Sequence, residues 1–174
     1  DRVYAQNTAG LSAFRYYSGN SFAIPDPNTT SHQPFGYDQW QGFFDSYTVT
    51  SSSIKITAIG HVYDCMFTLR PQLVTTHDSD IYESMERPNT SYQLIDTARS
   101  KTLKKSMTTL KVMGRPKNQD AETLSASYTQ SPQNQWYWMI QHQPFDNTNQ
   151  AYCSYTVEIT YHVLLRRKNR MASS

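Results

Sequence analysis

The sequence predicts an all-β fold, with strands pairing antiparallel in a sandwich. Several stretches alternate apolar and polar residues with a period of two, which places successive side chains on opposite faces of a strand. The 13 Tyr, 7 Phe and 3 Trp favour strands, because aromatic side chains pack well on a pleated sheet. At least seven such stretches occur without the alternating helices of a parallel α/β sheet, so antiparallel pairing is expected.

The regularity of the alternation decides how firmly each strand is expected. The clearest is a long strand near the end of the chain, at 153–165. Trp136, Trp138 and Ile140 belong to another strand, in which the two tryptophans point to one face and Tyr137 to the other. Further strands are expected at 54–58, 63–69 and 103–113 and, with weaker patterns, at 13–24 and 92–98.

Short helices are expected in two connections, at 37–47 and 80–87. In the first, Trp40, Phe43, Phe44 and Tyr47 recur at helical spacing and give the helix an apolar side. Asp38 is a candidate cap for its first turn. Proline and glycine punctuate the remaining connections, as is typical of loops between strands.

Residues 1–174 are expected to form one domain, because no shift in composition marks a linker. Cys65 and Cys153 are too few for a disulfide scaffold and lack the C-x-x-C spacing of a metal or redox site, so buried free thiols are expected. No apolar run approaches the roughly 20 residues of a membrane span. The sequence therefore predicts no membrane partner.

Chemistry-bearing motifs are missing from the sequence. It contains no nucleophile elbow, phosphate-binding glycine loop or zinc-protease helix, so we expect no enzyme activity, no metal and no cofactor. The nearest approach to a cation site is His77 with Asp78 and Asp80. A metalloenzyme on a similar scaffold would need two or more of the five dispersed histidines to converge with a carboxylate.

A net charge of +2 conceals two basic clusters, one between Asp96 and Asp120, where no acidic residue intervenes, and one at the chain end. Lysine and arginine supply affinity for nucleic-acid phosphates without sequence discrimination. A solvated strand face, or ion pairs with the acidic loop 78–86 of another subunit, are the open alternatives. Including two arginines near the first strand, the candidate contacts are Arg2, Arg15, Lys101, Lys104, Lys105, Lys111, Arg115, Lys117, Arg166, Arg167 and Lys168.

One local motif resembles a stretch that lies between the first two strands in capsid proteins of small circular Rep-encoding single-stranded DNA (CRESS-DNA, circovirus-like) viruses. Ser53-Ile54-Lys55-Ile56 follows it in a similar context. We interpret the motif as structural, a tight turn leading into a short helix. It reads His32, Gln33, Pro34, Phe35, Gly36, Tyr37, Asp38, Gln39 and Trp40.

The resemblance implies a single eight-stranded antiparallel jelly roll with short helices in its loops. It further implies self-assembly into a small icosahedral shell, T=1 with 60 copies, around a circular single-stranded DNA genome. The expected partners are then further copies of the chain, the genome and an unspecified host receptor, with a virion location and assembly in the host nucleus. Because the chain begins at Asp1 rather than Met, the basic arm of such proteins is expected to be missing.

A monomeric β-sandwich that binds carbohydrate or nucleic acid is the alternative interpretation. It shares the strand pattern and the aromatic loops, since one fold can support unrelated functions. The two interpretations differ in assembly, because only a capsid subunit forms closed symmetric particles.

Overall fold

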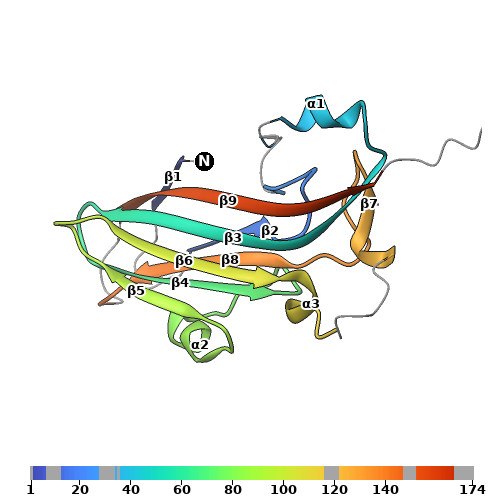
Figure 1. The fold of residues 1–174 in the computed structure, drawn as a ribbon. Helices are drawn as coiled ribbons and strands as arrows, with labels where there is room; N and C mark the ends of the chain where they lie inside the picture. The colour runs from blue at the N-terminus through green and yellow to red at the C-terminus, as the bar shows by residue number, and fades with distance from the viewer. Residues whose placement is uncertain are drawn as a thin grey trace, which may run out of the picture.

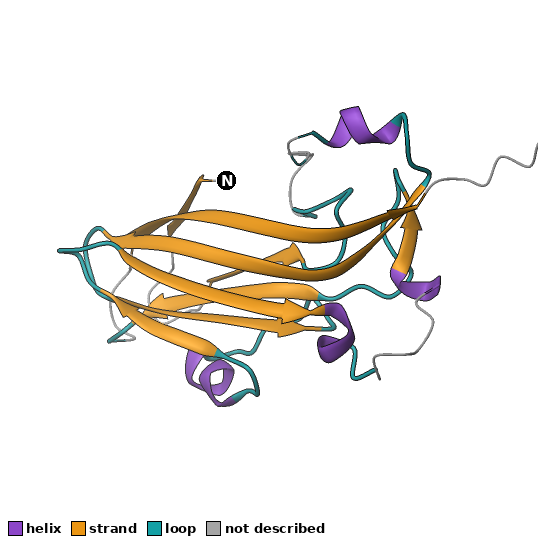
Figure 2. Ribbon diagram, in the orientation of Figure 1, coloured by secondary structure: helices purple, strands orange, loops and turns teal. Residues whose placement is uncertain are grey.

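The computed structural model describes residues 2–6, 13–27, 34, 36–115, 122–146 and 152–166. These residues form two stacked antiparallel sheets with short helices in the connections (Figure 1, Figure 2). The strands are β1 Arg2–Gln6, β2 Ala13–Ser18, β3 Ser46–Gly60, β4 Cys65–Gln72, β5 Ser91–Ile95, β6 Lys101–Thr108, β7 Ser125–Ser127, β8 Tyr137–Pro144 and β9 Tyr152–Arg166. The helices are α1 Tyr37–Gln41, α2 Ile81–Glu86, α3 Thr109–Val112 and the 3-10 turn η1 Glu122–Leu124.

The strand order identifies the fold. Sheet A has the order β1-β9-β3-β6, with the short β7 added beside the start of β3, and sheet B has the order β2-β8-β4-β5. Leaving β7 aside, the chain changes sheet between consecutive strands everywhere except between β4 and β5. This winding of two four-stranded antiparallel sheets is a jelly roll. The predicted eight-stranded all-β jelly roll is confirmed.

The core lies between the sheets and follows the predicted alternation. On β3, Ile54 and Ile56 are buried while the residues between them face outward, and β9 continues the pattern through Tyr155 and Val157. Trp136 and Trp138 are fully buried with ring centroids 5.0 Å apart, so the tryptophans expected on one face are core residues. Burying aromatic side chains of this size supplies much of the apolar stabilisation.

The polar edges of these tryptophans find partners inside the core. Trp138 Nε1 donates to Ser52 Oγ at 2.9 Å, and Trp136 Nε1 donates to Thr109 Oγ1 at 3.3 Å. A buried indole N–H without a partner would be costly, so these hydroxyls fix where the rings sit. The two cysteines are free and buried, as expected.

Gly19 lies directly after β2, where the backbone passes against the face of the Trp136 ring. A Cβ at this position would lie 2.3 Å from the nearest ring carbon. Gly19→Ala is therefore expected to lower the free energy of unfolding by about 1–3 kcal/mol, the usual cost of overpacking a filled core. Urea unfolding checks this, with Gly42→Ala as the control because a Cβ there meets nothing within 4 Å. Equal stabilities of the two variants would contradict the close packing.

Two predicted elements end earlier than expected. The helix expected at 37–47 stops at Gln41, because the chain from Ser46 onward pairs with β7 and β9 as part of β3. The strand expected at 103–113 ends at Thr108, whose hydroxyl accepts from Lys111 N at 3.3 Å and begins α3. A local hydroxyl cap and a long-range sheet pairing thus override the residue pattern.

The predicted helix at 80–87 is confirmed as α2. Asp80 is its N-cap, and its carboxylate accepts from Tyr82 N at 3.1 Å. The cap proposed for α1 was wrong, because Gly36 occupies the N-cap position at φ 80° and no side chain, including that of Asp38, caps this helix. None of the helices in the described part of the chain is long and apolar enough to cross a bilayer.

Candidate nucleic-acid interface

The outer face of sheet A is open and polar. On β6, Thr102, Lys104 and Ser106 point outward while Leu103 and Met107 enter the core. The matching outward residues of β3 and β9 are also polar, and hydroxyls dominate. They are Ser53, Lys55 and Thr57 on β3, and Thr156, Glu158 and Thr160 on β9.

Strand register aligns three charged residues across this face. Lys55 lies opposite Lys104 of β6 on one side and Glu158 of β9 on the other. Lys55 Nζ donates to Glu158 Oε1 at 2.6 Å, and this hydrogen bond lowers the pKa of the Glu158 carboxyl. Because Glu158 offsets one of the two lysines, the row keeps one net positive charge.

Beside this row lies a shallow hollow of about 380 Å³, lined by Ser53, Ile54, Lys55, Lys104, Lys105, Ser106, Glu158 and Thr160. Lys105 reaches it from the edge of the sandwich, where its Nζ donates to Ser91 Oγ at 3.0 Å. Burial, and secondarily the charge of Lys111, lower the pKa of Lys105. Ammonium groups among hydroxyls suit phosphate oxygens, which accept hydrogen bonds from both. We name this surface the sheet A hollow.

The other candidate cations lie apart from the sheet A hollow. Lys101 Nζ lies 3.4 Å from Asp96 Oδ2 in the connection from β5. Arg15 lies on the sandwich side of β2, pairs with the buried Asp26 at 2.6 Å and covers the Tyr17 ring. Its guanidinium is therefore committed to the fold rather than presented on an outer face.

Towards the other end of the molecule, Lys111 is exposed on α3, and Arg115 donates to Thr123 Oγ1 at 3.1 Å. Arg166 is exposed at the end of β9. For Arg2 only the backbone is described, paired with Thr156. Lys117, Arg167 and Lys168 lie outside the described residues.

Lys55 is the residue that sequence reasoning missed. It stands alone in the sequence, with no basic neighbour, and only the register of β3 against β6 brings it beside Lys104. Its outward position on an alternating strand was visible in the sequence, but its pairing partner was not.

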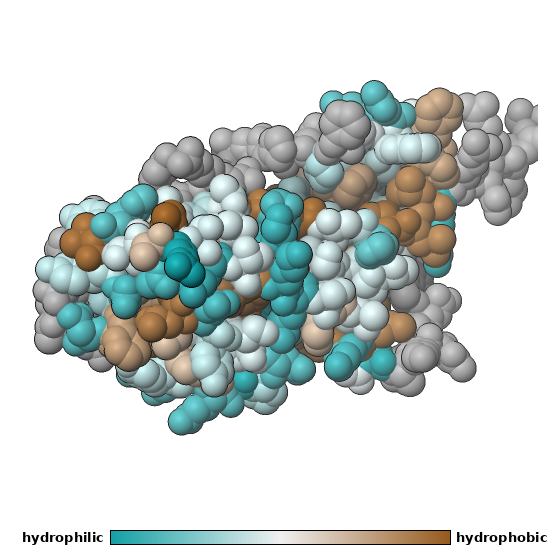
Figure 3. Space-filling model, turned by 60° about the vertical axis from the view of Figure 1, so that its left-hand side comes forward, coloured by the Kyte–Doolittle hydropathy of each residue, from teal (hydrophilic) through white to brown (hydrophobic). Residues whose placement is uncertain are grey.

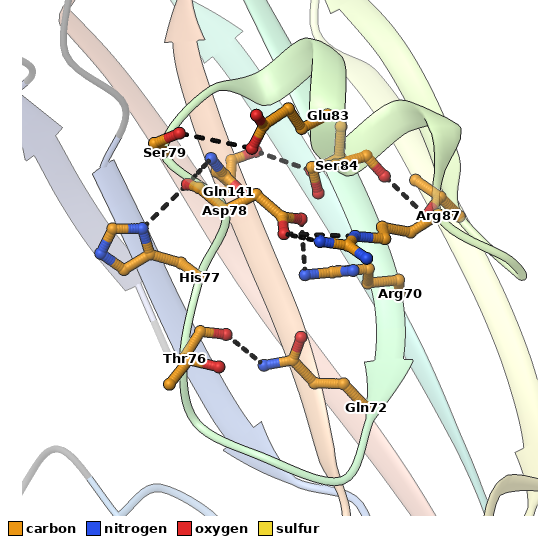
Figure 4. Close-up of polar contacts among 12 residues, drawn as sticks. Arg70, Gln72, Thr76, His77, Asp78, Ser79, Glu83, Ser84, Arg87 and Gln141 are labelled. Carbon is orange, nitrogen blue, oxygen red and sulfur yellow. Dashed lines mark hydrogen bonds and ion pairs between the residues drawn. The ribbon is translucent and has the colours of Figure 1, made fainter.

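The outer face of sheet B is closed by α2 and the loop before it (Figure 4). Asp78 is the centre of the contact: Arg70 Nη2 lies 2.8 Å from its Oδ2, and Arg87 Nη2 donates to its Oδ1 at 2.9 Å. Gln141 of β8 donates to the Asp78 carbonyl at 2.9 Å. On the same face, the Thr68 and Ser84 hydroxyls share a hydrogen bond of 3.2 Å.

These contacts bear on the cation site considered at His77, Asp78 and Asp80. The Asp78 carboxylate faces two guanidinium groups, and Asp80 caps α2. His77 Nδ1 bonds the Asp78 carbonyl at 2.9 Å, and its ring lies 3.8 Å from that of Phe14. Within the described ranges, no three histidine, cysteine or carboxylate side chains gather as a metal site.

The motif at 32–40 lies between β2 and β3, one strand later than the resemblance implies, because β1 precedes it. Its described residues are Pro34 and 36–40, while His32, Gln33 and Phe35 lie outside the described residues. Tyr37 anchors the motif: its hydroxyl donates to the Tyr128 carbonyl, and the Tyr128 hydroxyl donates to the Tyr37 carbonyl at 3.0 Å. Gly36 supplies the left-handed turn, and Asp38 and Gln39 are exposed.

The apolar side expected for this helix does not face the core throughout. Tyr47 is buried, but in β3 rather than in the helix. The side chain of Trp40 is 50% exposed and that of Phe43 is 63% exposed. The prediction was wrong because α1 is only five residues long and packs through Tyr37 alone.

No protein-family model and no curated protein sequence matches the chain. The chain is similar in structure to a protein of Sacbrood virus of honeybee, at 10% identity and a TM-score of 0.48, covering 100% of this chain and 79% of that one. It is also similar to Desmodium yellow mottle tymovirus, at 7% identity and a TM-score of 0.43, covering 99% and 90%. A semi-empty virus-like particle of Macrobrachium rosenbergii nodavirus gives 8% identity and a TM-score of 0.43, covering 97% and 96%. These TM-scores are below 0.5, so the fold assignment rests on the strand order.

Proposed function

We propose that this chain is a capsid subunit that assembles with copies of itself into a closed shell. The observation that carries the proposal is apolar surface at both ends of the sandwich, a feature that marks association sites when it is extensive. Trp40 and Phe43 are exposed at one end, and Val62 and Phe145 are 53% and 51% exposed at the other. Figure 3 shows hydrophobic side chains gathered in two such regions of the surface.

The finer features of the proposal come from the motif at 32–40 and its resemblance to CRESS-DNA virus capsid proteins. They are an icosahedral T=1 shell of 60 copies, a circular single-stranded DNA genome, a virion location and assembly in the host nucleus. A jelly roll is compatible with these features but also serves lectins and enzymes. Assembly is therefore the property to test first.

Electron microscopy of the purified chain, with absorbance at 260 and 280 nm on the same fraction, makes this test. Uniform closed particles are expected, because the exposed apolar ends would be covered in a symmetric assembly. A raised absorbance ratio would add that the particles hold nucleic acid. Monomers alone, across a range of salt and pH, would contradict the capsid proposal and favour the monomeric binding module.

Nucleic acid is proposed to lie against the outer face of sheet A. This face is uncovered and carries Lys55, Lys104 and Lys105 among hydroxyls, whereas α2 closes the outer face of sheet B. Phosphate contacts of this kind give affinity without base specificity. That property suits a protein that encloses a whole genome.

Lys104→Glu is expected to weaken binding of a single-stranded oligothymidine and to flatten its salt dependence. Each lost phosphate contact should reduce the slope of log affinity against log salt by about 0.7. The control is Lys101→Gln, because Lys101 faces Asp96 rather than the sheet A hollow. Slopes that are unchanged in the Lys104 variant, or equally reduced in both, would contradict this placement.

A further inference from the structure

Three consecutive connections leave an aromatic projection on the surface beside α1. Trp40, Phe43 and Phe44 form it, and we name it the aromatic knob. The Trp40 and Phe44 rings have centroids 6.0 Å apart, and the backbone N–H groups of Phe43 and Phe44 both donate to the Trp40 carbonyl, at 3.0 and 3.2 Å. Through Tyr37 and Tyr128 the knob is fixed to the sandwich, so it is held ready rather than ordered on contact.

A hollow of complementary character lies near α3. Its volume is about 420 Å³, and its lining combines apolar Leu73 and Met113 with Arg115 and the amide side chains of residues 133–135. Leu73 is 52% exposed. Pockets of this size enclose small organic ligands, so an indole ring fits within one. We name it the basic hollow.

The charges around the two features are opposite among the described residues. Asp38 and Asp45 flank the aromatic knob and are both exposed, with Arg166 as the one cation beside them. Lys111 and Arg115 flank the basic hollow, and Arg115 is held there by its hydrogen bond to Thr123. Opposite potentials across a contact steer association and disfavour wrong pairings.

We propose that the aromatic knob of one subunit inserts into the basic hollow of a second copy of this chain. The proposal rests on the assembly proposed above and names the surfaces that make it. Buried tryptophan and arginine side chains dominate the binding energy of many interfaces, and both are present here.

The positions of the two features make the contact head-to-tail. In Figure 1, α1 lies beyond β9 on one side of the sandwich, whereas α3 lies on the other side at the end of β6. A subunit therefore offers its knob to one neighbour and its hollow to another. Repetition of such a heterologous contact generates a closed ring, which is the building unit of a symmetric shell.

The distribution of tryptophan gives a direct test. The sequence has 3 Trp, and of these Trp136 and Trp138 are fully buried while Trp40 is half exposed. Acrylamide quenching of tryptophan fluorescence therefore reports on Trp40. We expect this quenchable component in dissociated subunits and its loss in assembled particles, because the knob becomes enclosed.

Trp40→Ala is expected to raise the critical concentration for assembly by at least about 30-fold, the effect of truncating a hot-spot tryptophan. The control is Gln39→Ala, which alters an exposed neighbour on the same helix and should leave assembly unchanged. Thermal unfolding of dissociated subunits checks that each variant folds. Assembly of the Trp40 variant at the wild-type concentration, or equal losses in both variants, would overturn the inference.

Charge exchange tests the direction of the contact. Asp45→Lys and Arg115→Glu are each expected to reduce assembly, and the combined variant should regain it, because the exchange restores opposite charges across the contact. If the wild-type chain forms particles but Trp40 stays quenchable in them, the inference is wrong and the capsid proposal stands. If the wild-type chain forms no particles, the capsid proposal fails and this inference fails with it.

Discussion

Asp78→Ala is expected to lower the free energy of unfolding by about 3–5 kcal/mol, the usual result of removing one member of a buried ion pair. The Asp78 carboxylate is 8% exposed, and the Arg70 side chain that faces it is 10% exposed. Without Asp78 the Arg70 guanidinium keeps its charge at every accessible pH, because its pKa is so high. An unpaired buried cation then stands on the outer face of sheet B.

The measurement is urea unfolding of dissociated subunits followed by fluorescence. Glu86→Ala on the same helix is the matched control, expected to stay within about 0.5 kcal/mol because Glu86 is exposed. Combining Asp78→Ala with Arg70→Met should recover part of the loss, since an apolar side chain replaces the stranded charge. Similar stabilities of the single and combined variants would show that Arg70 is not the residue left unpaired.

His142 is expected to make the fold sensitive to acid between about pH 6.5 and 4. It lies in the core on β8, stacked on Phe67 with ring centroids 5.1 Å apart and 2% exposed. Burial lowers the pKa of His142 to about 4, below the value of about 6.5 in an unfolded chain. As the pH falls through this window the unfolded chain binds the proton first, so stability is lost, by about 3 kcal/mol in total.

The contribution of His142 appears as a difference between variants. His142→Gln is neutral at every pH, so its free energy of unfolding should fall less between pH 6.5 and 4 than that of the wild type. His162→Gln, at an exposed position of β9, is the control and should follow the wild-type curve. Parallel curves for the wild type and His142→Gln would exclude His142 as the acid-sensitive group.

The fold could be predicted because its signals are local. Alternation alone placed Trp136 and Trp138 on one buried face and identified β9 almost to its ends. Asp80 predicted the start of α2 by its capping chemistry. Where a long-range pairing competes with a local pattern, as at Phe43 and Phe44 before β3, the sequence does not show which one prevails.

The candidate interface depends on non-local geometry, and the sequence predicted less of it. Lys104 and Lys105 were chosen for the charge of their segment, but the register that adds Lys55 has no local signal. Arg15 was chosen for its position near the first strand, yet its partner Asp26 turns it towards the sandwich. The placement of the genome on this face stays a prediction until binding is measured.

The pairing of β3 with β9 governs when the polypeptide can fold. These two 15-residue strands are the centre of sheet A, and their paired residues are roughly a hundred positions apart in the sequence. Loop closure over such a distance is slow, and topologies dominated by distant contacts fold slowly. A ribosome must therefore release nearly the whole polypeptide before sheet A can close. Until then the inner face of β3 has no partner strand, which makes the nascent chain a natural client for chaperones.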